Sequence, residues 1–162
     1  MKRITGIFIV VLSLLLGNNK ADAQTWQIGG DMTSFYVSAF RYQFSALGGY
    51  EFNDKIAVQA SFGITGVENY SNYLAGAYFR YTPWHSDVLY LDLRFRALIR
   101  TDLTVTEGAD IGITPILRFR CNQHWDFFAT IGSLGARYEE FNWAPCIGLI
   151  NSNTDIGVIY RF

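Results

Sequence analysis

The stretch Val88–Arg100 reads VLYLDLRFRALIR and alternates in polarity along most of its length. One face of an extended chain would carry Leu89, Leu91, Leu93, Phe95, Ala97 and Ile99. The other face would carry Tyr90, Asp92, Arg94, Arg96 and Arg100, with Leu98 as its single apolar exception. A period of two residues is typical of a β-strand, because successive side chains point to opposite faces. The stretch therefore predicts a strand with one apolar and one charged face.

The same alternation recurs along the chain between turn-forming segments. Strands are predicted at about 25–34, 42–52, 56–67, 73–81, 88–100, 110–120, 125–137 and 147–162. Every second connection is a tight turn (NDK at 53–55, TPWHSD at 82–87, CNQH at 121–124), and the others are longer or more polar: FYVSAFR, ENYSN, TDLTVTEGA and YEEFNWAPC. The pattern predicts an all-β fold, a single eight-stranded antiparallel up-and-down barrel that crosses a membrane.

The first 23 residues have the three parts of a secretory signal peptide. Lys2 and Arg3 precede the apolar run Ile4–Leu16, and ADA at 21–23 supplies the small residues of a cleavage site. A membrane-anchoring helix needs about 20 apolar residues, so this run is too short for one. We expect residues 1–23 to be removed and residues 24–162 to form one domain.

The charge of that domain is mild, with 10 basic and 13 acidic residues after the first 23 are excluded. Recognition of nucleic acid calls for a clustered basic surface, so no nucleic-acid partner is expected.

Aromatic residues decide which face of the strands points outward. A soluble lipocalin-like barrel keeps its apolar face inside, whereas a membrane barrel turns it toward lipid. Aromatic residues gather at both strand ends, as bilayer interfaces favour. The short-turn end carries Trp26, Tyr50, Phe52, Tyr81, Trp84, Trp125, Tyr160 and Phe162, and the other end Phe35, Tyr70, Tyr73, Tyr138, Phe141 and Trp143.

The last predicted strand places Ile156, Val158, Tyr160 and Phe162 on one face, and the sequence stops at Phe162. This arrangement resembles the C-terminal signal of Gram-negative outer-membrane barrels, and the domain resembles the small OmpA-transmembrane-domain and OmpX-like barrels. The resemblance implies a place in the outer membrane, contact with its lipid, and insertion by the barrel-assembly machinery acting on the last strand. It also leaves room for an extracellular ligand at the acidic loops, which carry Asp102, Glu107, Asp110, Glu139 and Glu140.

The inward face would hold a charged network. Its predicted members are Glu51, Arg80, Asp92, Arg94, Arg96, Arg118, Arg120, Asp126, Asp155 and Arg161. Eight strands leave a lumen only wide enough for side chains to fill, so we expect these residues to close it. The tight turns predict that Glu51 faces Ala57, Arg120 faces Asp126, and Tyr78 faces Asp92. The resulting role is structural or adhesion-like surface interaction; the alternatives are a narrow anion-preferring pore, and a secreted lipocalin-like barrel binding an apolar ligand.

No catalytic or metal-binding constellation is evident in the sequence, and no cofactor is expected. His85-Ser86-Asp87 is adjacent in a predicted turn, where neighbouring residues do not form a nucleophile–base chain. Cys121 and Cys146 are expected at opposite ends of the barrel and therefore as free thiols. Pro115 is unexplained, because inside a strand it removes one donor from the ladder.

Overall fold

The computed structural model of the chain describes residues 25–36, 40–67, 70–101, 106–139, 142–149 and 155–162. Within these ranges the regular elements are ten antiparallel strands. They are β1 (Thr25–Tyr36), β2 (Phe40–Asn53), β3 (Ile56–Val67), β4 (Tyr70–His85), β5 (Leu89–Thr101), β6 (Thr106–Arg120), β7 (Trp125–Thr130), β8 (Gly132–Glu139), β9 (Asn142–Leu149) and β10 (Asp155–Arg161). The described part of the chain has no helix of the length and apolarity needed to cross a membrane. The expected signal peptide, 1–23, lies outside the described residues.

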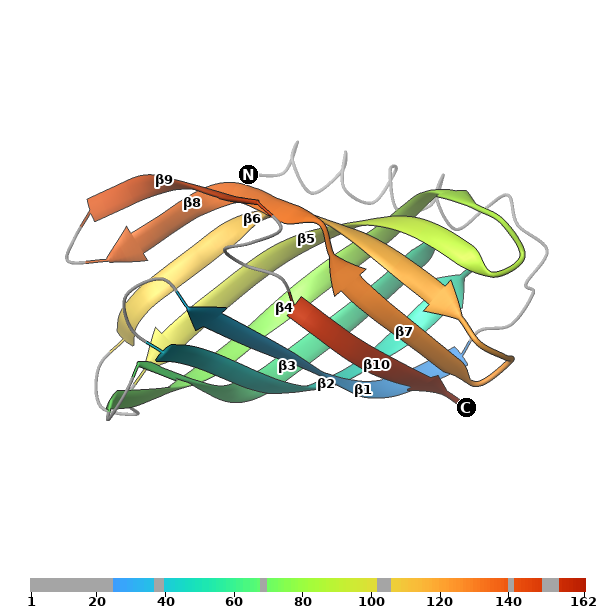
Figure 1. Cartoon of the computed structure of the whole chain (residues 1–162), viewed down its shortest axis with the longest axis horizontal. Coiled ribbons are helices and arrows are strands. Elements are labelled where there is room, and N and C mark those ends of the chain that lie inside the picture. The colour runs from blue at the N-terminus through green and yellow to red at the C-terminus, as the bar shows by residue number, and fades with distance from the viewer. Residues whose placement is uncertain (1–24, 37–39, 68–69, 102–105, 140–141, 150–154) are drawn as a thin grey trace, which may run out of the picture.

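The strands close into a barrel (Figure 1). β1 to β6 pair in sequence order, β7 and β8 both pair with β6, and β10 pairs with β7 and β1. β7 and β8 lie along successive halves of β6, and together they take the place of the predicted strand 125–137. β9 pairs with β8, and β9 and β10 together take the place of the predicted strand 147–162. The predicted eight-stranded up-and-down barrel is therefore confirmed.

Pro115 lies at a β-bulge in the wall. On one side of it Ile116 faces Thr130 of β7, and on the other Ile113 faces Leu134 of β8. Two residues of β6 therefore lie opposite three residues, 131–133, which is the definition of a bulge. The carbonyl of Pro115 accepts a hydrogen bond from the amide of Ile131 at 2.9 Å. A residue's N–H and C=O point to the same side of an antiparallel strand, so an N–H at position 115 would also point toward the bulge. Proline therefore lacks its donor at a place where the ladder is already interrupted.

The last predicted strand, 147–162, is wrong as a single strand. β9 covers Asn142–Leu149 and pairs with β8, whereas β10 starts at Asp155 and lies between β1 and β7. Cys146 consequently sits inside β9, opposite Gly135, and not in an extracellular loop as predicted. Hairpins on the long-loop side extend further than expected, and only 140–141 separate β8 from β9.

β4 also runs further than predicted. It continues through Pro83 to His85, with a register shift between Tyr81 and Trp84, so TPWHSD is mostly strand. The predicted pairing of Tyr78 with Asp92 is wrong, since Tyr78 faces Arg96. The observed partner of Tyr78 lies four residues from the predicted one, which is an even number, so the same face of β5 points inward in both pairings. Glu51 opposite Ala57 and Arg120 opposite Asp126 agree with prediction.

The polarity of the barrel is inverted relative to a soluble protein. Outward side chains are apolar and exposed, as with Phe62 (59 % exposed) and Ile99 (47 %). Nine charged side chains are buried in the described interior: Asp31, Glu51, Arg80, Asp92, Arg94, Asp110, Arg118, Asp126 and Arg161. An apolar lumen of the kind a lipocalin-like barrel needs is therefore absent among the described residues.

Candidate functional site

A dense group of charges fills the lumen near the short turns. We call it the short-turn cluster; its members are Glu51, Arg80, Asp92, Arg118, Arg120, Asp126 and Arg161. They come from β2, β4, β5, β6, β7 and β10, so the cluster ties together most of the barrel wall. It assembles because each strand places every second residue inside.

Arg118 is the centre of the short-turn cluster. Its Nε lies 2.7 Å from Asp92 Oδ2, and its Nη1 lies 2.7 Å from Asp126 Oδ2. The guanidinium also stacks over the ring of Tyr90, with 4.3 Å from Cζ to the ring centroid. The Arg118 side chain is only 1 % exposed, so the fork geometry of arginine supplies the donors that the two carboxylates have lost from water.

The other cations of the short-turn cluster surround this centre. Arg80 Nη2 lies 2.5 Å from Glu51 Oε2, and Arg161 Nη2 lies 3.1 Å from Asp126 Oδ1. Arg120 is 3.5 Å from Asp126 and 3.7 Å from Glu51. Each carboxylate of the cluster thus faces at least two arginines, so cations outnumber acids among its seven members.

Neutral side chains supply further hydrogen bonds to two carboxylates of the short-turn cluster. Thr82 Oγ1 donates to Asp92 Oδ1 at 2.6 Å, and the side-chain amide of Gln27 donates to Glu51. Gln59 in turn donates to Gln27 at 3.1 Å. Burial removes the hydrogen bonds that a carboxylate makes with water, and Thr82 and Gln27 replace some of them for Asp92 and Glu51.

A second charged group lies further toward the long loops. We call it the long-loop cluster; its members are Asp31, Arg94, Arg96, Asp110 and Arg137. Arg96 Nε lies 2.7 Å from Asp110 Oδ1, and Arg137 Nε lies 3.5 Å from Asp110 Oδ2. Arg94 Nη1 is 3.8 Å from Asp31 Oδ2, while Ser45 donates to Asp31 Oδ1 at 2.7 Å. The structure thus divides the predicted network into two groups.

Asp155, another predicted member, opens β10. Its backbone amide donates to Thr130 Oγ1 at 2.7 Å, and its residue surface is half-buried. It therefore lies inside the barrel wall at the end of a strand, beyond the short-turn cluster.

An apolar layer packs between these groups. Its members, which come from six different strands, are Leu47, Tyr78, Leu98, Ile116, Phe128 and Ile159. Tyr78, Ile116 and Ile159 each lie one inward position along a strand from an arginine of the short-turn cluster. Arg94 stacks over Tyr78 (4.8 Å) and Phe128 (4.6 Å), which joins the apolar layer to the long-loop cluster.

Glycines make room for this layer. A Cβ at Gly157 would overlap the ring of Phe128 and come within 2.5 Å of the Gly30 carbonyl oxygen. A Cβ at Gly76 would overlap Leu98. The narrow lumen therefore accommodates large side chains opposite positions that have none.

The predicted aromatic positions lie on the outer face. At the short-turn end, rings of neighbouring strands contact one another: Trp26 with Tyr50 (5.1 Å) and Trp125 with Tyr160 (4.8 Å). Further ring contacts join Tyr50 to Phe52 and Tyr160 to Phe162. Tyr81 and Trp84 are exposed on β4; at the other end Tyr73 stacks on Phe62, and Tyr138 contacts Trp143. The side chains of Phe35, Tyr70 and Phe141 lie outside the described residues.

The two histidines make structural contacts. His85 stacks on Tyr90, and Ser86 Oγ donates to the carbonyl oxygen of Leu89. His124 Nδ1 lies 2.9 Å from the carbonyl oxygen of Arg161, and its ring stacks on Tyr160. Ser86 and His85 thus have partners other than each other's side chain. Cys121 and Cys146 are free, as predicted.

Sequence reasoning missed several lumen residues. Asp31 and Gln27 were overlooked because Gly29 and Gly30 weaken the alternation of β1. Arg137 falls on the outward face if the parity of β7, in which Asp126, Phe128 and Thr130 face inward, is continued along the chain. The bulge at Ile131 reverses this parity, so Ser133 and Arg137 turn inward; Pro115 was the one signal for it.

Comparisons with known proteins bear on the fold. No family model matches the sequence, and no curated protein matches it. Among solved structures, the N-terminal β-barrel domain of Pseudomonas aeruginosa OprF is similar with a TM-score of 0.50 at 17 % identity, covering 88 % of this chain and 100 % of that one. The chain has the fold of a small transmembrane β-barrel.

Two further solved structures were found. Neisserial surface protein A has a TM-score of 0.48 at 11 % identity, covering 89 % of this chain and 100 % of its own. A de novo designed transmembrane β-barrel has a TM-score of 0.43 at 10 % identity, covering 89 % of this chain and 100 % of its own.

Proposed function

We propose that this chain is an outer-membrane protein whose barrel spans the bilayer with a closed lumen, in a structural or surface-interaction role and without catalysis. The inverted polarity is the observation that carries the proposal. Apolar side chains cover the outside, and nine charged ones are buried within. In a bilayer the outward apolar side chains contact lipid and not water. A closed barrel also leaves no strand edge with unpaired backbone N–H and C=O groups.

The aromatic rings support the placement of this barrel across a bilayer. Trp26 (66 % exposed) and Phe162 (69 %) project from the short-turn end, and Trp143 (50 %) projects from the other. Indole and phenol rings are stable at bilayer interfaces, where one edge is apolar and the other is hydrated. Because outer-membrane barrels have short periplasmic turns and longer extracellular loops, we place the short turns in the periplasm and the longer loops outside the cell.

Packing in the lumen supports closure. Arg80 and Arg118 are each 1 % exposed, and the apolar layer fills the space beside them. A narrow anion-preferring pore would need a hydrated path past these arginines. The described interior favours the closed form over this alternative.

Partners follow from the same placement. The outward row Ile156, Val158, Tyr160 and Phe162 is our proposed contact for the barrel-assembly machinery. Loops on the extracellular side are the proposed contact for a ligand. The described residues leave out 102–105 and 140–141 of these loops, as well as the side chains of Glu107 and Glu139. Membrane lipid surrounds the wall.

Fractionation with a heat-modifiability gel tests this proposal. The full chain, expressed in a Gram-negative host, should sediment with the outer membrane and migrate faster in detergent before boiling than after. A matched sample with Asp92→Lys, which buries a fifth cation among the arginines, should lose the fast band. Recovery of the wild-type chain as a soluble protein with one band in both conditions would contradict the proposal.

A further inference from the structure

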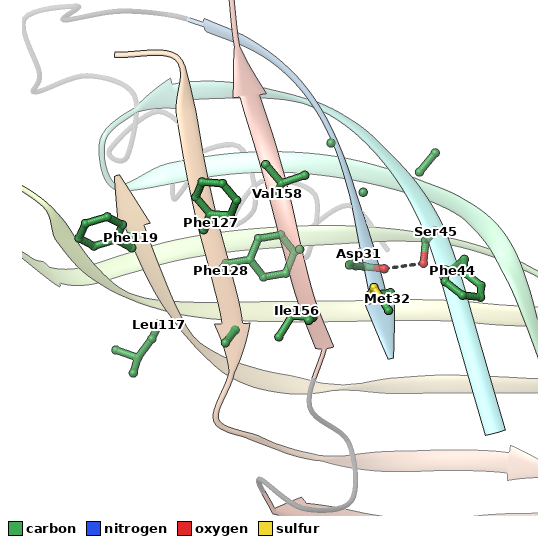
Figure 2. Close-up of a pocket in the computed structure, with 15 residues that line it drawn as sticks. Asp31, Met32, Phe44, Ser45, Leu117, Phe119, Phe127, Phe128, Ile156 and Val158 are labelled. Atoms are coloured by element: carbon green, nitrogen blue, oxygen red, sulfur yellow. Dashed lines mark hydrogen bonds between the residues drawn. The ribbon is translucent and has the colours of Figure 1, made fainter. Parts of the chain in front are cut away.

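A long groove crosses the outer wall of the barrel beside the seam where β10 meets β1 (Figure 2). It is open to the outside, has a volume of about 910 Å³ and passes over β2, β1, β10, β7 and β6. Met32 and Phe44 stand at one end of it and Phe119 and Phe127 at the other. Four interstrand steps of about 4.8 Å give it a length of roughly 19 Å.

The groove exists because small residues occupy neighbouring outward positions. Cross-strand pairing places Ala46 beside Gly30, and Gly30 beside Val158. In the next row toward the long loops, Ile156 lies beside Ala129. Large side chains such as Met32, Phe44 and Phe127 border these small ones, so the wall is hollowed between ridges and is not uniformly flat.

The groove offers hydrocarbon contacts and no charged one. Its polar members are Asp31 and Ser45, whose side chains are buried and hydrogen-bonded to each other at 2.7 Å. Asp31 also faces Arg94 within the lumen. These two residues therefore contribute backbone to the groove, and a ligand lying in it must be apolar along its length.

We propose that the groove binds one acyl chain of a membrane phospholipid, a proposal that rests on the proposed function. Tyr160 and Trp125 lie in the row next to the groove on the short-turn side. A headgroup at this aromatic belt would place its chain in the adjoining leaflet, where half of the roughly 30 Å hydrocarbon core is available. A groove about 19 Å long that runs obliquely across tilted strands matches one chain of that leaflet.

A second copy of the barrel is the competing occupant. An antiparallel barrel wall is convex, so a partner would need a projecting ridge to enter a concave groove. The groove is also continuous with the apolar outer surface, which lipid covers in the proposed orientation. These features favour a flexible chain over another wall.

Native mass spectrometry of the full chain tests the site. The protein is extracted with detergent from nanodiscs of phosphatidylethanolamine and phosphatidylglycerol. The phospholipid that stays bound is measured after the detergent is removed. Ala46→Phe/Ala129→Phe fills the groove, and Ala60→Phe/Ala97→Phe adds the same two rings to outward positions of β3 and β5. Ala46→Leu is a milder filling variant.

We expect the wild type and the β3/β5 variant (Ala60→Phe/Ala97→Phe) to retain one phospholipid, and Ala46→Leu to retain less. The groove-filled variant (Ala46→Phe/Ala129→Phe) should retain at least tenfold less phospholipid than the wild type. Equal retention by the two double variants would overturn the site, as would a dimer that only the groove-filled variant abolishes. A heat-modifiable wild type without retained lipid removes this proposal alone. A wild type without heat modifiability removes the proposed function as well.

Discussion

Arg118 holds two carboxylates inside the barrel and has almost no contact with solvent. Its bonds to Asp92 and Asp126 are both 2.7 Å long, and Tyr90 covers one face of its guanidinium. Replacing both members of a buried pair by apolar groups can be neutral, whereas removing one member leaves a buried charge without compensation. The short-turn cluster is therefore sensitive to single substitutions.

Arg118→Met should lower the free energy of unfolding by about 3–5 kcal/mol, because Asp92 and Asp126 then lose their closest cation. The measurement is urea unfolding of the barrel in lipid vesicles, followed by tryptophan fluorescence. Lys55→Met, in an exposed turn, is the control and should change little. A loss below about 1 kcal/mol for Arg118→Met would show that the pairs are hydrated and weak.

Gly157 and Gly48 form a matched pair of glycines. Gly157→Ala should cost about 1–3 kcal/mol, since the new Cβ overlaps Phe128 and approaches a backbone oxygen. Gly48→Ala has open space and should be neutral or slightly stabilising. The same unfolding assay compares them, and equal effects would argue against tight packing of the apolar layer.

At the scale of elements, alternation predicted the inward faces of β2 to β6 over the stretches in which these strands keep a period of two. Glu51, Arg80, Asp92 and Arg118 could be placed inside from the sequence alone. The prediction lost accuracy where an extra residue enters a strand, as at Ile131 and near Pro83. A bulge depends on which neighbouring strand supplies the partner, and that partner is distant in sequence.

Deleting Ile131 should show that the bulge accommodates Pro115. The deletion restores one-to-one pairing between β6 and the wall strand, and Pro115 then leaves a gap in a regular ladder. We expect a loss of about 1–3 kcal/mol from the unsatisfied carbonyl opposite it. Combining the deletion with Pro115→Val should recover most of the loss in the same assay. Additive effects of the two changes would contradict this coupling.

At the scale of the whole molecule, charges tie the strands together and the apolar layer fills the middle of the lumen. Six strands contribute to this layer, and Arg94 stacks on it from the long-loop side. Hydrophobic constrictions block ions by excluding water, even where charged residues lie on both sides. We therefore expect the apolar layer, and not the ion pairs alone, to stop flow.

Phe128→Ser/Ile116→Ser should open a narrow conductive path by removing two members of the layer while leaving the arginines in place. Single-channel recording in planar bilayers measures the current, and anion selectivity is expected from the excess of arginine. Phe127→Ser/Leu117→Ser changes neighbouring outward positions and serves as the control. A silent lumen variant that is still heat-modifiable would assign closure to the charged clusters.

Current through the wild-type barrel tests the central claim most directly, because a closed lumen and a pore differ in this one quantity. The full chain, reconstituted in a planar bilayer and verified by heat modifiability, should give no current steps above the bare membrane at high salt. Steady, ohmic and anion-selective steps from the unaltered chain would contradict closure and identify a pore.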